Sequence, residues 1–120
     1  MEQRLQVVPM RRWRHYATPS GRRPTREFIE TLAPHEYARL ASAMRAVEEN
    51  GTNAARHLRG DLYEVRTQGT TDLRVIFATE GRWSHILLAL HAFSKKSQRT
   101  PQGHLRLAED RLRGWRARGT

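Results

Sequence analysis

Basic side chains stand at the ends of several short apolar stretches of this sequence: Arg66, Arg74, Lys95 and Lys96. Arginine offers phosphate oxygens a planar fork of donors, and lysine offers a compact positive charge. Such donors stabilise the negative charge that develops while a phosphodiester is broken. The set therefore suits metal-free cleavage of RNA, in which the 2′-hydroxyl attacks the adjacent phosphate. Arg66, Arg74 and Lys96 are the catalytic candidates, although an exposed surface position is an equally good interpretation of Arg66.

This reaction also needs a proton acceptor and a proton donor, for which histidines are the first candidates. His57 lies in a polar stretch with Arg56 and Arg59, so we expect it to be exposed and either to contact RNA or to donate a proton. The two arginines are candidates for RNA binding. His91 is another, although a hydrogen-bonded core histidine is the alternative in so apolar a stretch. His104 opens the last helical pattern and is interpreted as a surface residue. The group that accepts the 2′ proton stays open.

The other basic positions also have a structural interpretation. An unpaired charge inside an apolar strand is costly, so Arg74 must reach solvent, a ligand, or an acid such as Glu64 or Asp72. The basic loop at 95–99 contains Arg99, which we predict to bind RNA together with Lys95. The alternative for this loop is that its charge only keeps the protein in solution.

Positive charge is concentrated at the two ends of the 120-residue chain, whose formal net charge is +10. Residues 1–24 carry six arginines and one acid, and residues 94–120 carry eight basic residues and two acids. Residues 25–93 carry eight arginines and nine acids. This distribution indicates a nucleic-acid partner. An arginine-rich source genome with a solvated tail is the alternative, and a membrane surface is disfavoured because no segment combines a broad apolar face with a basic one.

The composition does not indicate a metal site or a membrane-spanning segment. The sequence has no cysteine, and its acids and histidines do not cluster as Mg²⁺ or Zn²⁺ ligands would, so we expect no metal ion or other cofactor. The longest apolar run, Ile86–Leu90, is far too short to span a membrane. Arginines interrupt the first residues where a signal peptide would be apolar. We therefore expect a cytoplasmic protein.

The hydrophobic pattern predicts one α+β domain at 12–117, preceded by an extension at 1–11. Alternating side chains predict strands at 12–18, 62–66, 73–78 and 86–93, the last three as an antiparallel meander with its third strand central in the sheet. Apolar residues at helical spacing predict helices after Pro24, after Pro34 as far as Asn50-Gly51, and around Leu105 to Trp115. Residues 52–60 are expected to be a polar link. The predicted order is β-α-α-β-β-β-α, with helices packed on a sheet.

Five segments carry a family resemblance: Gly21–Phe28, Leu62–Arg66, Leu73–Phe77, Leu90–Lys96 and Thr100–Pro101. In this order and spacing they resemble the RelE/ParE toxin superfamily, and more closely its phage-derived HigB-like branch. The resemblance covers roughly residues 13–117 and implies a RelE-like fold.

What the resemblance implies is the toxin of a type II toxin–antitoxin system that acts as a ribosome-dependent mRNA interferase. Its partners would be the ribosome, mRNA and a helix-turn-helix antitoxin (HigA-like), with operator DNA reached only through the antitoxin. It also implies that Arg74 holds the scissile phosphate. Because one fold serves several functions, two alternatives remain: a poison of DNA gyrase, and a non-catalytic RNA- or ribosome-binding module. The cation set favours the nuclease, since a gyrase poison needs no phosphate clamp on its sheet.

Overall fold

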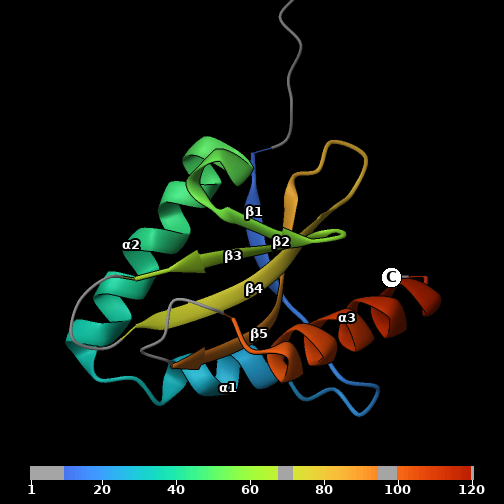
Figure 1. Ribbon diagram of the computed structural model, residues 1–120, viewed down its shortest axis with the longest axis horizontal. Helices are drawn as coiled ribbons and strands as arrows, with labels where there is room; N and C mark the ends of the chain where they lie inside the picture. Colours follow the sequence, from blue (N-terminus) through green and yellow to red (C-terminus); the bar gives the residue numbers. More distant parts are fainter. Residues whose placement is uncertain (1–9, 68–71, 95–99, 120) are drawn as a thin grey trace, which may run out of the picture.

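The computed structural model describes residues 10–67, 72–94 and 100–119 (Figure 1). Its elements, in chain order, are β1 (Arg12–His15), α1 (Pro24–Glu30), α2 (Pro34–Asn50), a 3₁₀ turn η1 (Gly51–Ala54), β2 (Arg56–Arg59), β3 (Leu62–Arg66), β4 (Leu73–Glu80), β5 (Ile86–Ser94) and α3 (Gln102–Ala117). The strands form one mixed sheet in the order β1-β5-β4-β3-β2, in which only the β1–β5 pair is parallel. The predicted α+β class is confirmed.

The predicted element order is wrong at one place, the link at 52–60. This segment forms η1 and then β2, which pairs with β3 as a short antiparallel hairpin. Four strands, not the predicted three, therefore lie between α2 and α3 in the sequence. In Arg56–Arg59 only Leu58 is apolar, and one apolar residue shows no alternation. The strand predicted last, β5, is internal between β1 and β4, while β4 holds the middle position.

Helices cover both faces of the sheet (Figure 1). One face, here called the α2 face, packs Leu40 and Val47 of α2 against Val65, Val75 and other strand residues. The opposite face, here called the α3 face, packs the predicted stripe of α3 (Leu105, Ala108, Leu112 and Trp115) against the sheet; all four side chains are buried. Because side chains alternate along a strand, each strand residue belongs to one of these faces.

Strand β5 breaks this alternation at Leu90. Ile76 of β4 pairs with His91, but the next residue, Phe77, pairs with Ala89, so Leu90 has no partner on β4. An extra residue of this kind is a β-bulge, which often re-aims a neighbouring side chain. Leu90 packs in the α3-face core, and His91 contacts α3 as well. The bulge therefore turns two consecutive side chains of β5 to the same face.

The C-terminal end of α2 is closed from outside the helix. Gly51 has φ of +69°, a conformation that favours glycine, and the helix ends there as the sequence predicts. Nη1 of Arg11 donates to the carbonyl oxygens of Glu48 and Glu49, at 3.1 and 3.4 Å. These carbonyls have no partner within a helix, so Arg11 supplies one. None of the helices built from the described residues is long and apolar enough to cross a membrane.

Candidate nucleic-acid interface

The end of β3, the start of β4 and the end of β5 lie side by side at one end of the sheet, here called the rim. Arg66 is the cross-strand partner of Arg74, and Leu73 is that of Ser94. The carboxylate of Glu64 joins these elements: it accepts a hydrogen bond from Oγ1 of Thr100 at 2.6 Å. The sheet thus brings two of the predicted catalytic residues, Arg66 and Arg74, together with Ser94 and Thr100, which flank the basic segment 95–99 in the sequence.

Two arginines share the Glu64 carboxylate. Nη2 of Arg66 lies 3.4 Å from Oε1 of Glu64, and Nη1 of Arg74 lies 3.8 Å from Oε2. Nη2 of Arg74 also donates to Oδ2 of Asp72 at 3.0 Å. The side chains of Arg74 and Glu64 have no exposed surface, whereas that of Arg66 is 22% exposed. For Arg74, the acid contacts that the sequence left as an alternative have formed with both acids, and of the two arginines only Arg66 presents surface to a ligand.

Lys95, Lys96 and Arg99 lie outside the described residues, so their predicted roles stay predictions. The neighbours that the structure does describe, Ser94 and Thr100, both lie at the rim.

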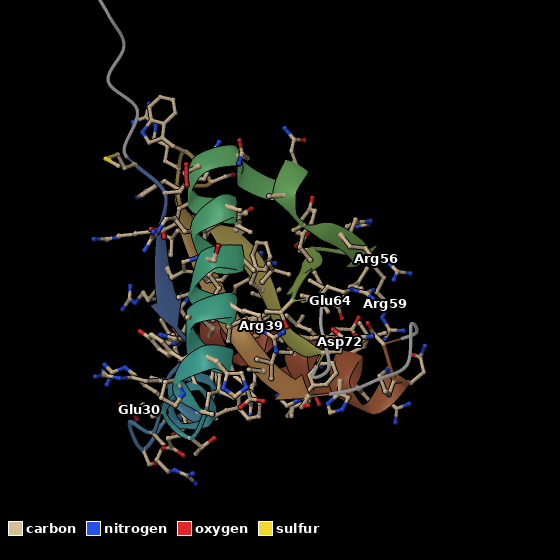
Figure 2. All side chains as sticks on the ribbon, turned by 90° about the vertical axis from the view of Figure 1, so that its left-hand side faces the viewer. Glu30, Arg39, Arg56, Arg59, Glu64 and Asp72 are labelled. Carbon is tan, nitrogen blue, oxygen red and sulfur yellow. The ribbon has the colours of Figure 1, made fainter. Side chains whose placement is uncertain are left out.

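Arg56 and Arg59 of β2 lie on the α3 face, Arg56 beside Glu64 and Arg59 near the β2–β3 turn, away from the rim. Arg56 is the cross-strand partner of Glu64. Arg59 makes a two-pronged ion pair with Glu109 of α3, at 3.0 and 2.8 Å, and this hydrogen bonding lowers the pKa of Glu109 and raises the pKa of Arg59. Figure 2 shows Arg56, Arg59, Glu64 and Asp72 gathered in one region of the molecule. Of these two predicted RNA-binding arginines, Arg56 is therefore the one next to the rim residue Glu64, whereas Arg59 binds α3.

His57 points away from this group. It is exposed, its Nε2 lies 2.8 Å from the carbonyl oxygen of Gly60, and its ring packs on Tyr63 with centroids 5.1 Å apart. Tyr63 packs against the α2-face core. Alternation along β2 thus separates His57 from the carboxylate of Glu64.

His91 is half-buried and contacts α3. Its Nε2 lies 2.7 Å from Nδ1 of His104, and its ring stacks on Phe93. The hydrogen-bonded histidine that the sequence offered as an alternative has formed, at the edge of the core. Burial, and then the positive charges of His104 and Arg111, lower the pKa of His91 to about 4.

Sequence reasoning missed His104 and Arg111. His104 was interpreted as a surface residue, but it stacks on Phe93 with centroids 3.7 Å apart and binds His91. Arg111 donates from Nη1 to the carbonyl oxygen of Leu90 at 2.7 Å and lies 3.5 Å from Nδ1 of His91. The signal was helical spacing, because His104 and Arg111 are seven residues apart and so share the face of the buried stripe.

Three arginines on the β1 side of α3 contact rings and carbonyls. Arg14 lies 4.8 Å from the ring centroid of Trp115, and Arg111 and Arg118 each lie 5.5 Å from that of Tyr16. Arg118 also donates to a backbone carbonyl. Burial lowers the pKa of Arg111. Among the described residues, no acid lies within ion-pair distance of these three guanidinium groups.

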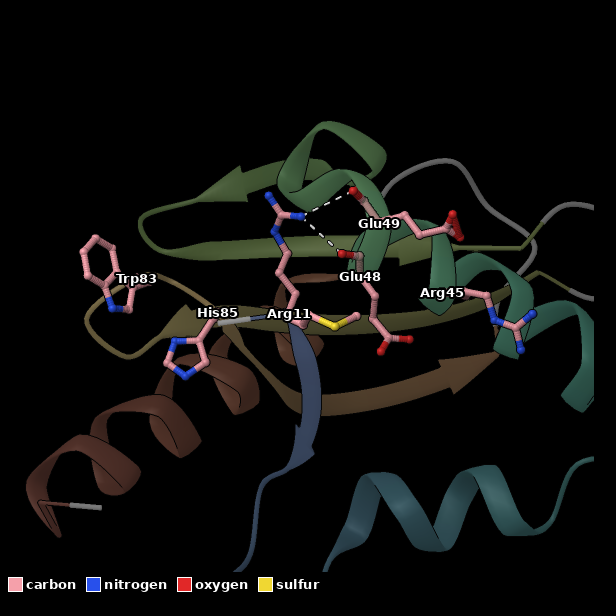
Figure 3. Close-up of a pocket in the computed structure, with 7 residues that line it drawn as sticks. Arg11, Arg45, Glu48, Glu49, Trp83 and His85 are labelled. Carbon is pink, nitrogen blue, oxygen red and sulfur yellow. Dashed lines mark hydrogen bonds between the residues drawn. The ribbon is translucent and has the colours of Figure 1, made fainter. Parts of the chain in front are cut away.

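A large cavity of about 740 Å³ lies at the other end of the sheet (Figure 3). It lies between the start of β1, the end of α2 and the β4–β5 turn, and is lined by Met10, Arg11, Arg45, Glu48, Glu49, Trp83 and His85. None of the candidate residues that the structure describes lines it. Within the described ranges, no three His, Asp or Glu side chains are grouped to hold a metal ion.

The comparison with protein families identifies the domain. The family model of the phage-derived Gp49-like proteins (DUF891) matches residues 27–113, which run from α1 to α3 and include every described candidate residue of the interface. No curated protein is similar enough in sequence to count as a match. Since the matched region is most of the chain, this protein belongs to the family of phage-derived Gp49-like proteins.

Proposed function

We propose that this protein is the toxin of a type II toxin–antitoxin system and acts as a ribosome-dependent mRNA endoribonuclease. Gp49-like proteins are commonly related to toxin–antitoxin systems, which supports the first part. The observation that carries the second part is the rim, where Arg66 and Arg74 are cross-strand partners and lie with Ser94 and Thr100, the residues that flank the basic segment 95–99 in the sequence.

In the proposed reaction the 2′-hydroxyl of one nucleotide gives up its proton and attacks its own 3′-phosphate, and the bond to the 5′-oxygen of the next nucleotide breaks. The leaving 5′-oxygen takes up a proton, so the products are a 2′,3′-cyclic phosphate and a 5′-hydroxyl. Arg66 has exposed surface to contact a phosphate oxygen, and Lys96 stabilises the charge of the phosphorane. Arg74 is a positioning residue, because its enclosed guanidinium holds Glu64 and Asp72 in place. The charges of the protein supply the stabilisation, so the proposal needs no metal ion.

The two histidines that the sequence offers are assigned to RNA contact and not to proton transfer. His57 lies on the opposite face of β2 from Glu64, which favours contact with RNA over proton transfer at the rim. His91 is neutral at pH 7 because its pKa is about 4, so it binds RNA without carrying charge. Correct placement of the mRNA by the ribosome supplies part of the rate enhancement.

The proposed partners follow from charge and family. The net charge of +10 suits the ribosome and mRNA. A helix-turn-helix antitoxin (HigA-like) would inhibit the toxin, and operator DNA would be bound only through that antitoxin.

Primer extension on a reporter mRNA, with and without translating ribosomes, tests the proposal. We expect new 5′ ends only with ribosomes, and cleavage by Lys96→Ala reduced by about 100-fold. The control is Arg82→Ala, which removes an exposed arginine from the β4–β5 turn at the far end of the sheet and should leave cleavage unchanged.

The alternatives give other results in the same assay. No new ends, together with accumulated DNA breaks in cells, would replace the nuclease with a gyrase poison. No new ends, together with co-sedimentation with ribosomes, would leave a non-catalytic ribosome-binding module.

A further inference from the structure

Strand β1 forms one edge of the sheet. In the strand order of the described residues it pairs with β5 on one side and ends the sheet on the other, at one margin of the molecule (Figure 2). The backbone amides of Arg12 and Tyr16 donate toward the β5 side, each at 2.9 Å. Because these groups alternate in direction along a strand, the N–H and C=O groups of Trp13 and His15 point to the outer edge. Such an edge is a template on which a further strand can pair.

The α3-face side of this outer edge is positively charged. Side chains alternate along β1, so those of Arg12 and Arg14 lie on the α3 face, and both residues are exposed. The guanidinium of Arg14 lies 4.8 Å from the ring centroid of Trp115, and that of Arg118 lies 5.7 Å from it. The ring holds these groups in place and leaves their charge uncancelled. Acidic side chains on an added strand would form favourable cross-strand pairs here.

The α2-face side of the same edge holds a small pocket. Its volume is about 120 Å³, and most of its lining is aliphatic or aromatic: His15, Ile29, Tyr37, Leu40, Ala41 and Met44. Tyr37 is 53% exposed, although it is aromatic. The pocket suits one apolar side chain, which would gain by leaving water. A strand that pairs with β1 would therefore alternate acids on one face with apolar residues on the other.

Positive charge also acts on the α2-face side of β1. Burial, and then the charges of Arg26 and Arg23, lower the pKa of His15, against a smaller opposing effect of Glu30. Arg26 and Glu30 form an exposed ion pair at 3.5 Å. The field at His15 is thus net positive on this side as well, which favours an acidic partner over a basic one.

The backbone of the outer edge favours a peptide over other occupants. A second copy paired edge to edge would bring Arg12 and Arg14 close to the same residues of the first copy, and opposed like charges are destabilising. RNA phosphates could contact the arginines, but they offer no donor to the outward carbonyl oxygens of Trp13 and His15. A peptide strand supplies donors and acceptors in alternation.

We propose that the outer edge of β1 binds an extended, acidic segment of a partner protein as an added strand. Acids of this segment face Arg12 and Arg14, and an apolar residue between them enters the pocket beside His15. Main-chain hydrogen bonds supply affinity in this mode, and the alternate side chains supply specificity. The inference rests on the proposed function only for the identity of the partner, which would be the antitoxin.

Methylated peptides test strand addition on the full-length protein. The probe is a short fluorescein-labelled peptide of alternating glutamate and valine, followed by anisotropy. One version carries N-methyl groups on its valines and another on its glutamates. We expect one version to bind like the unmodified peptide and the other to bind about tenfold more weakly, because it loses hydrogen bonds to Trp13 and His15. The weak version carries methylated valines if the added strand runs antiparallel to β1, and methylated glutamates if it runs parallel.

Two outcomes of this assay would overturn the proposal. One is that the unmodified peptide does not bind. The other is that the two methylations have equal effects, because contact through charge alone, which RNA would make as well, does not depend on the direction of the peptide amides.

Charge reversal tests the α3-face side of the edge. We expect Arg14→Glu to weaken binding of the glutamate–valine peptide about tenfold, and to bind a lysine–valine peptide more tightly than the wild type does. Arg113→Glu is the matched control, since it makes the same change of charge at an exposed position of α3. Its affinity should stay within about twofold of the wild type. Equal effects of the two reversals would contradict a site at β1.

Hydrogen exchange in the wild-type protein keeps the proposal testable if Arg14→Glu does not fold. The glutamate–valine peptide should slow exchange of the amides of Trp13 and His15, and unchanged exchange would overturn the proposal. Peptide binding by a protein that cuts no mRNA would retain this surface and reject the proposed nuclease. Cleavage by a protein that binds no peptide would do the reverse.

Discussion

The arginines on the β2 side of α3 and those on its β1 side differ in what their guanidinium groups contact. On the β2 side, Arg59, Arg74 and Arg116 each contact at least one carboxylate. On the β1 side, Arg14, Arg111 and Arg118 contact aromatic rings and backbone carbonyls. One helix therefore separates a region of neutralised charge from a region of uncompensated charge.

The difference teaches how the net positive charge is used. On the β2 side, ion pairs between arginines and carboxylates hold the strands and α3 together. Much of the positive charge of these arginines therefore stabilises the fold. Rings on the β1 side hold the guanidinium groups in place without cancelling their charge. A polyanion should therefore be attracted more strongly to the β1 side of α3 than to its β2 side.

The largest effect is expected for Glu64→Ala, at the centre of the neutralised region. Its carboxylate is fully buried and contacts Arg66, Arg74 and Thr100. Removing one partner of a buried ion pair costs about 3–5 kcal/mol, because the remaining charge loses its compensation. Urea denaturation should show this loss in the free energy of unfolding.

Glu27→Ala is the control for that prediction. Glu27 forms an exposed ion pair with Arg22, so its removal should change stability little. Equal stability of the two variants would mean that the rim network contributes nothing to the fold.

A smaller effect is expected from the pH dependence of His91, at the border of the two regions. Its pKa in the folded protein is about 4, below the ordinary value of 6.5, because of burial and of the charges of His104 and Arg111. The unfolded chain therefore takes up the proton first, and stability should fall as pH drops from about 6.5 to 4. Since His91 is partly exposed, we expect a loss of about 1–2 kcal/mol, less than the shift alone would imply.

Denaturation of wild type and His91→Gln at a series of pH values measures this contribution. The fall in stability should be smaller in the variant, while His57→Gln, which alters an exposed histidine, should resemble the wild type. A fall of the same size in His91→Gln would assign the acid sensitivity to other groups.

The smallest effect is expected for Arg116→Ala. Arg116 contacts Asp61 at 2.8 Å and Glu80 at 2.7 Å, and hydrogen bonding to these acids raises its pKa. Because the group is largely exposed, solvent screens the pair, and we expect a loss of about 1 kcal/mol. Thermal unfolding should show a lower midpoint for Arg116→Ala than for Arg113→Ala, because Asp110, the described ion-pair partner of Arg113, is exposed. Equal midpoints would show that paired arginines on this side do not stabilise the sheet.

Much of the fold follows from the sequence because its elements are long or strongly periodic. The stripe from Leu105 to Trp115 identified α3, and alternation identified β3. Strand β2 was missed because its strand state depends on pairing with β3, and its four residues hold a single apolar side chain. Local pattern does not reveal a strand that tertiary pairing creates.

The site was predictable where it depends on alternation and charge. Glu64 and Asp72 could be expected as partners of Arg74, because a buried cation must be compensated by an acid. The Leu90 bulge has no such signal, since no glycine marks it and a shift of one residue leaves the composition of β5 unchanged. Without the bulge the face of His91 is assigned wrongly, and its contacts with α3 stay hidden.

The central claim, cleavage through the 2′-hydroxyl of mRNA on the ribosome, is tested most directly by changing that one atom. Programmed ribosomes would carry an mRNA with a single 2′-deoxynucleotide at the mapped cut site, beside an all-ribose control. We predict that the control is cut, with a 2′,3′-cyclic phosphate on the upstream product, and that the deoxy substrate stays intact at this position. Cleavage of the deoxy substrate at the same site and rate would contradict the account.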